Sequence, residues 1–92
     1  MKYTVKLGSK WKVQQFELVP LKQDHTKQIL PANVVYVDYN TVYVYTELEY
    51  EVGQLVSIGG YQISGKKFKM IELSITDFPV LEGAMIVEKE EI

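Results

Sequence analysis

The stretch VVYVDYNTVYVYT, from Val34 to Thr46, is the most β-prone part of this 92-residue chain. It contains two runs of β-branched and aromatic residues, Val34 to Val37 and Val42 to Thr46, which are typical of strands. The residues between them, Asp38 to Thr41, include Asp and Asn, which tolerate turn conformations and bond to their own backbone. The stretch therefore predicts two neighbouring strands that are hinged at a short turn.

Alternating apolar and polar residues predict further short strands before this stretch. Tyr3 to Leu7 follows the period-2 pattern of a half-buried strand, and Trp11 to Gln15 continues it. Pro20 places the end of the next apolar segment at a sheet edge or a bulge. The polar segment from Lys22 to Ile29 is expected to form a loop or a single helical turn.

Turn residues divide the second half of the chain. From Glu47 to Val52 acidic and apolar residues alternate, which predicts an acidic ridge if this segment is extended. Leu55 to Ile58 is the next expected strand, with a turn at Gly59-Gly60 and a hairpin at Ser64 to Lys67. A change in apolar parity predicts a β-bulge between Met70 and Ile71.

Near the end, Val80-Leu81 and Ala84 to Val87 are expected to flank Glu82-Gly83, and Glu88 to Glu91 are expected to be solvated. The whole chain contains 12 Val, 7 Ile and 5 Thr but only two Ala. This composition favours strands over helices. We expect one domain over residues 1–92: a small antiparallel β-barrel or sandwich of about seven short strands, with at most one short helical turn.

The composition also limits the chemistry. The chain has no cysteine, one histidine and no arginine, so we predict no catalytic residue, no cofactor and no metal ligand. Residues 1–30 carry a net charge of +4 and residues 31–92 carry −6, which gives the overall −2. The apolar runs are short, as at Val34 to Val37, and Met1 to Thr4 opens no signal peptide, so we expect a cytoplasmic protein without membrane contact.

Two segments between Ala32 and Ile75 resemble the PilZ family of β-barrel domains. Val37 to Tyr43 occupies the D/N-x-S-x-x-G turn of that family, and Leu48 to Ile58 occupies its glycine-containing step. Asn40 stands where the family has Ser, Tyr43 stands where it has Gly, and no R-x-x-x-R arm exists without arginine. The resemblance implies a degenerate PilZ-like barrel that acts through protein contacts and does not bind cyclic dimeric GMP.

Three acidic groupings suggest chemistry, but each has a simpler interpretation. His25 beside Asp24 has no second His or Cys to complete a metal site, and a surface loop is expected. The alternating acids Glu47, Glu49 and Glu51 lack the turning glycine of a calcium loop, so a solvated face is expected. Asp38 with Glu47 or Glu49 is the carboxylate pair that a small hydrolase would need, and nothing singles it out. Ser64 to Lys67 lacks the spacing of a phosphate-binding loop.

A nucleic-acid surface is the alternative function. Lysines interleave with aromatic residues near the start of the chain, as in barrels that stack bases within a basic groove. The residues are Lys2, Tyr3, Lys10, Trp11 and Lys12. The net charge of −2 and the absence of arginine weigh against this alternative.

Tyrosine is the residue in clear excess, with six of the seven between positions 36 and 61. Exposed tyrosines are favoured at protein interfaces, although they equally complete a thin two-layered core. The predicted interface comprises Tyr39, Tyr43, Tyr45, Glu47, Glu49 and Tyr50. We expect a non-enzymatic module that contacts another protein or its own copies, as an adaptor, a small inhibitor or an assembly subunit; a viral accessory or virion protein would look alike.

Overall fold

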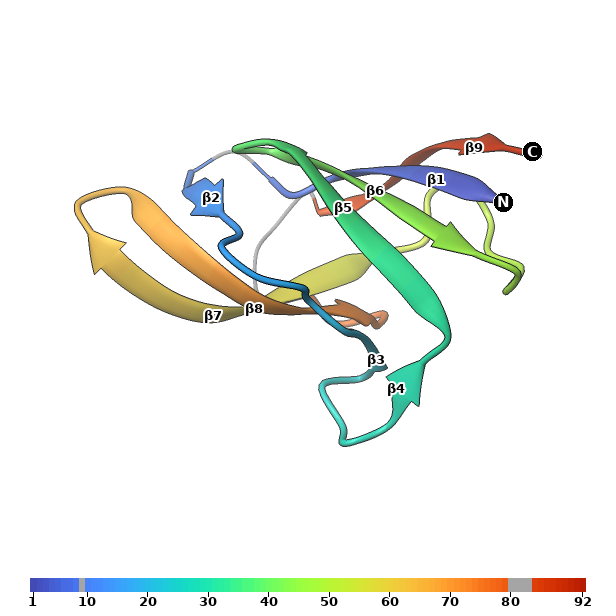
Figure 1. Cartoon of the computed structure of the whole chain (residues 1–92), viewed down its shortest axis with the longest axis horizontal. Coiled ribbons are helices and arrows are strands. Elements are labelled where there is room, and N and C mark those ends of the chain that lie inside the picture. The colour runs from blue at the N-terminus through green and yellow to red at the C-terminus, as the bar shows by residue number, and fades with distance from the viewer. Residues whose placement is uncertain (9, 80–83) are drawn as a thin grey trace.

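The computed structural model describes residues 1–8, 10–79 and 84–92, which form nine strands and no helix (Figure 1). The strands are β1 (Lys2–Lys6), β2 (Lys12–Gln14), β3 (Leu21–Gln23), β4 (Ile29–Leu30), β5 (Ala32–Asp38), β6 (Thr41–Thr46), β7 (Val56–Ser64), β8 (Lys67–Ile75) and β9 (Met85–Glu90). The expected mostly-β fold is confirmed. Within the described ranges no helix could cross a membrane.

Strands β5, β6, β1 and β9 form an antiparallel sheet in that order, here called sheet A. β5 and β6 are the two strands predicted from the most β-prone stretch. The turn between them is held by a hydrogen bond of 3.0 Å from the backbone N–H of Asn40 to the Asp38 carboxylate. Because β1 and β9 are antiparallel neighbours, the two chain ends lie side by side at one end of the molecule (Figure 1).

The second sheet, sheet B, is built around β8. β7 pairs with one edge of β8 in a hairpin, while β2 and β3 follow one another along the other edge and run parallel to β8. β4 extends the sheet beyond β3. The two parallel pairs differ from the purely antiparallel arrangement expected. They form because the chain from β2 to β3 advances along the same edge of β8 without reversing.

The core fills the space between the two sheets. An isolated bridge between Leu55 and Met85 connects them on one side, and the N–H of Val13 donates to the carbonyl of Tyr39 (3.0 Å) on the other. The sheets do not merge into a closed barrel. The largest fully buried apolar side chains are Tyr3, Val5, Leu7, Val13, Leu21, Val42, Val56, Met70, Leu73 and Ile86.

The β-bulge predicted between Met70 and Ile71 is confirmed. Gly59 pairs with Glu72 and Gly60 pairs with Met70, so Ile71 is the extra residue on β8. Its side chain is 45% exposed, whereas Met70 is fully buried. The bulge therefore restores the inward direction of the apolar residues that follow it.

The prediction that Gly59-Gly60 turns the chain is wrong, because both residues lie inside β7. A Cβ atom on Gly60 would overlap the carbonyl oxygen of Lys69 on β8. Glycine is therefore needed here for a close approach of two backbones at the bulge, and the turn itself comes later, at Gly65 with φ of +51°.

Two other segments differ from their expected form. Glu47 to Val52 makes no strand, although its three glutamates are exposed as the ridge prediction required. The segment from Lys22 to Ile29 is partly strand, since it includes the end of β3 and the start of β4, with Asp24 and His25 at positive φ between them. The predicted elements at Val80-Leu81 and Glu82-Gly83 lie outside the described residues.

Candidate functional site

The outer face of sheet A brings two of the predicted interface residues together. Because Val42 and Val44 point into the core, Tyr43 and Tyr45 point outward, and their rings meet edge to face at 6.5 Å. The ammonium of Lys2 stands 4.0 Å from the centre of the Tyr43 ring. Val35 on β5, the register partner of Tyr43 on β6, is 43% exposed. No described element covers this face (Figure 1).

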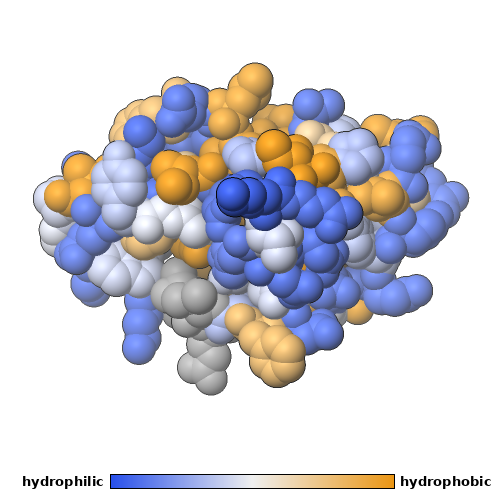
Figure 2. All heavy atoms as spheres, turned by 90° about the horizontal axis from the view of Figure 1, so that it is seen from below, coloured by the Kyte–Doolittle hydropathy of each residue, from blue (hydrophilic) through white to orange (hydrophobic). Residues whose placement is uncertain are grey.

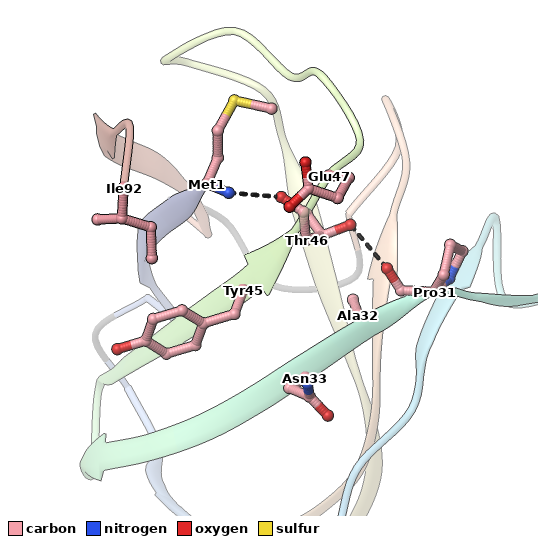
Figure 3. A pocket seen from close by; sticks show the side chains of 8 residues that line it. All are labelled: Met1, Pro31, Ala32, Asn33, Tyr45, Thr46, Glu47 and Ile92. Carbon is pink, nitrogen blue, oxygen red and sulfur yellow. Dashed lines mark hydrogen bonds between the residues drawn. The ribbon is translucent and has the colours of Figure 1, made fainter.

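A hollow of about 710 Å³ adjoins this face beyond the end of β6. Figure 3 shows that Tyr45, Glu47 and the two chain ends, Met1 and Ile92, stand around it. A hydrogen bond of 2.7 Å from the Thr46 hydroxyl to the carbonyl of Pro31 joins two of the residues that line the hollow. Tyr45 therefore belongs both to the outer face and to the hollow.

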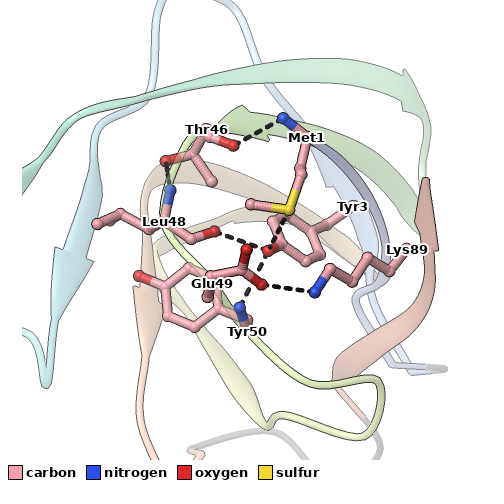
Figure 4. Close-up of polar contacts among 7 residues, drawn as sticks. All are labelled: Met1, Tyr3, Thr46, Leu48, Glu49, Tyr50 and Lys89. Atoms are coloured by element: carbon pink, nitrogen blue, oxygen red, sulfur yellow. Dashed lines mark hydrogen bonds and ion pairs between the residues drawn. The ribbon is translucent and has the colours of Figure 1, made fainter. Parts of the chain in front are cut away.

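The loop after β6 is anchored by Tyr3 (Figure 4). The Tyr3 hydroxyl donates to the carbonyl of Leu48 (2.7 Å) and accepts from the N–H of Tyr50 (3.0 Å). The Tyr50 ring packs edge-on against Tyr3 at 5.7 Å, and burial, followed by the nearby Tyr3, raises the pKa of Tyr50. Tyr50 is thus a partly buried packing residue in the loop after β6, whereas Tyr43 and Tyr45 lie on the outer face of sheet A.

Two of the predicted acidic interface residues lie in this loop. Glu49 accepts a hydrogen bond of 2.8 Å from the ammonium of Lys89, and this bond raises the pKa of Lys89 (Figure 4). Glu47 lines the hollow instead. Tyr39, in contrast, lies at the other end of β6, in the turn after β5. The six residues of the predicted interface are therefore divided among the outer face of sheet A, the loop after β6, the hollow beside it and the turn after β5.

The residues of the alternative nucleic-acid surface are divided as well. Lys10, Trp11 and Lys12 line one open groove of about 530 Å³, together with Tyr39 and Lys66. The other two do not belong there. Tyr3 has no exposed surface, so its ring cannot stack on a base, and Lys2 forms an ion pair with Glu90 (3.7 Å) near the opposite end. For Tyr3 and Lys2 the prediction is wrong, because alternation places Tyr3 inward and the length of β1 separates both from Lys10.

The carboxylates considered for hydrolysis do not converge. Asp38 ends β5 and Glu47 follows β6, so the length of β6 lies between them, and Glu49 is farther along the same loop. Within the ranges that the structure describes, no three His, Asp or Glu side chains form a group that could hold a metal ion. Asp24 and His25 lie in an exposed turn, as expected.

This turn is fixed to β8 by a polar cluster that the sequence did not predict. Both Lys22, at 2.9 Å, and the Nδ1 atom of His25 contact the carboxylate of Glu72. Burial alone would raise the pKa of Glu72, but hydrogen bonds from His25 and Lys22 outweigh it and lower the pKa. The pKa of Asp24 is also lowered, chiefly by a hydrogen bond from Gln23. The cluster thus holds the turn over sheet B.

Figure 2 shows sheet B from the side of this turn. Hydrophilic side chains stand in the middle, where the segment lowest in Figure 1 comes nearest to the viewer, and hydrophobic groups lie around them in small separate patches. Elsewhere on sheet B, the ammonium of Lys69 on β8 lies 5.7 Å from the ring centre of Phe16 and 5.8 Å from that of Tyr61. This face offers scattered contacts, in contrast to the tyrosine pair on sheet A.

Sequence reasoning did not place Lys66 in the groove with Trp11, or Lys67 opposite Lys12. The two lysines were interpreted only as part of a hairpin, and nothing in the spacing indicated that β2 would run parallel to β8. No family model, curated protein or solved structure matches the chain. The resemblance to PilZ domains therefore stays a prediction.

Proposed function

We propose that this protein is a non-enzymatic binding module that contacts another protein, or its own copies, through the outer face of sheet A. The observation that carries the proposal is the tyrosine pair Tyr43 and Tyr45 on a sheet face that no described element covers, continued by Tyr45 into the hollow. An adaptor, a small inhibitor or an assembly subunit would each use such a surface. The proposal places the module in the cytoplasm.

The chemistry of this face supports a protein partner. Tyrosine provides a large rigid contact area with a polar tip, and its two rotatable side-chain angles make ordering inexpensive in entropy. Lys2, Glu90 and Glu47 surround the pair with both charge signs, as at the polar rim of an interface. A degenerate PilZ-like domain without its ligand arm would act in the same way.

The test uses the double variant Tyr43→Ala/Tyr45→Ala. Both side chains are only partly buried, so the variant is expected to fold. Size-exclusion chromatography with light scattering would report self-association, and capture from the native cell, compared side by side with wild type, would report a partner. We expect the variant to lose the larger species or the captured protein, because tyrosine is enriched among the interface hot spots, whose truncation costs about 2 kcal/mol or more of binding energy.

The matched control is Tyr61→Ala, which removes an exposed tyrosine from sheet B. It should assemble and capture as the wild type does. If the double variant behaves like Tyr61→Ala in both measurements, the outer face of sheet A is not the binding surface and the proposal fails.

A further inference from the structure

Three segments that are distant in sequence build the groove around Trp11. The N–H of Lys12 donates to the carbonyl of Lys66 at the tip of the β7–β8 hairpin (2.7 Å). The N–H of the next residue, Val13, donates to the carbonyl of Tyr39 in the β5–β6 turn (3.0 Å). These two bonds fix β2 between the hairpin tip and the turn, so the groove has a defined backbone frame.

Two aromatic side chains line this groove. The Trp11 ring packs on Phe68 at 5.7 Å, which is part of the sheet B hairpin and contacts the core, so its orientation is fixed from behind. Tyr39 stands in the same groove with 52% of its surface exposed. A rigid ring with a supported back and an accessible partner ring is what a flat, unsaturated ligand requires for stacking.

The groove is also cationic. Lys10, Lys12 and Lys66 line it, and Lys67 is the register neighbour of Lys12 on β8. None of these four lysines forms an ion pair with a carboxylate in the described part of the chain. The neighbouring Asp38 carboxylate is engaged with the backbone N–H of Asn40. This end of the molecule therefore presents lysines that have no ion-pair partner among the described residues.

We propose that this groove binds single-stranded nucleic acid, with bases stacked on Trp11 and Tyr39 and phosphates held by Lys10, Lys12 and Lys66. An acidic peptide would satisfy the lysines but leave both rings without a flat partner. Duplex DNA keeps its bases stacked on one another and cannot offer them to the rings. Lysine holds phosphate as a point charge, and stacking on the two rings is available to every base, so binding tolerates many sequences.

Trp11 is the single tryptophan of the chain and therefore reports on its own groove. Titration with an oligothymidine at low salt should quench its fluorescence, and the anisotropy of a labelled oligothymidine should rise in parallel. A poly-glutamate peptide and a duplex of equal charge should bind at least about tenfold more weakly. No rise in anisotropy with the oligothymidine, or equal binding of poly-glutamate, would overturn the proposal.

Two matched pairs of variants separate stacking from charge. Tyr39→Ala should weaken oligothymidine binding by about fivefold or more, the effect of losing one stacked base, whereas the equally exposed Tyr61→Ala should not. Lys66→Gln should lower the slope of log affinity against log salt by about 0.7, whereas Lys27→Gln, in the exposed turn before β4, should leave it unchanged. If each control variant changes oligothymidine binding as much as its matched groove variant does, binding comes from the charge of the whole molecule and not from this groove.

The site is separate from the face proposed for protein contacts. Tyr43→Ala/Tyr45→Ala should bind oligothymidine like wild type, and Tyr39→Ala should keep any assembly that the sheet A face mediates. Failure of one proposal therefore leaves the other standing.

Discussion

The two ends of the long axis carry opposite charges, and they differ in how those charges are treated. At one end Lys10, Lys12 and Lys66 line the groove of Trp11, Lys67 pairs in register with Lys12, and none of the four has an acidic ion-pair partner among the described residues. At the other end, near the chain termini, two glutamates have lysine partners: Glu49 pairs with Lys89 and Glu90 with Lys2. Unpaired charge is the kind that a fold leaves available for a ligand, while paired charge belongs to the protein's own surface.

Strand register, and not position in the sequence, decides which end a charge occupies. Lys2 belongs to the basic first third of the chain, yet β1 carries it to the acidic end beside Glu90. Lys66 and Lys67 belong to the acidic remainder, yet the hairpin carries them to the basic end. The charge asymmetry of the folded protein is therefore a product of its topology.

Gly60→Ala should distort the basic end of the molecule and should cause the largest loss of stability. A methyl group at this position would overlap the carbonyl oxygen of Lys69, so the β7–β8 hairpin must shift at the bulge. Overpacking costs about 1–3 kcal/mol, and backbone cannot move aside as a side chain can, so the cost should lie at the upper end. The displaced hairpin tip would also move Lys66 away from Trp11. Urea denaturation should show the loss of stability, and Trp11 fluorescence of the native variant should show the altered groove.

The control for this prediction is Gly65→Ala at the hairpin tip. Gly65 has φ of +51° and open space around it, so alanine there costs only about 1 kcal/mol of left-handed strain. Equal destabilisation by the two variants would show that the bulge does not demand a close backbone approach.

Tyr3→Phe should loosen the loop at the acidic end of the molecule and should cause the next largest loss of stability. The change removes the hydroxyl that bonds both Leu48 and Tyr50 and leaves their partly buried backbone groups unpaired. Such losses cost about 1–2 kcal/mol. Hydrogen exchange of the Tyr50 amide should accelerate, and urea denaturation should show the lower stability. Tyr43→Phe is the control; a similar loss there would contradict the anchoring role of Tyr3.

Local patterns were sufficient to predict much of sheet A. Val34 to Val37 and Val42 to Thr46 alternate or run as strands do, and the Asp38 turn uses its own side chain, so no distant residue is needed. The bulge at Ile71 was also visible, because parity is a local property. Gly59-Gly60 misled because glycine permits both a turn and a close approach, and only the facing Lys69 carbonyl decides between them.

The candidate sites could be predicted only in part, since each depends on pairing between distant strands. The outward direction of Tyr43 and Tyr45 follows from alternation within β6. The residues around Trp11 cannot be predicted in this way, because they depend on β2 running parallel to β8 and on the hydrogen bond between the Tyr39 turn and Val13. A single sequence gives the face of a residue more readily than its neighbours.

The charges themselves should give the smallest effects, with opposite signs at the two ends. Lys66→Gln relieves repulsion among neighbouring lysines and should raise the melting temperature by about 1–2 °C at low salt, while Glu49→Gln removes the partner of Lys89 and should lower it by a similar amount. Both shifts should disappear in 1 M salt, where screening acts within about 3 Å. Thermal melts followed by circular dichroism would measure them. If Lys66→Gln lowers the melting temperature instead, the lysines at the basic end are stabilised within the fold, and their charge is not free for a ligand.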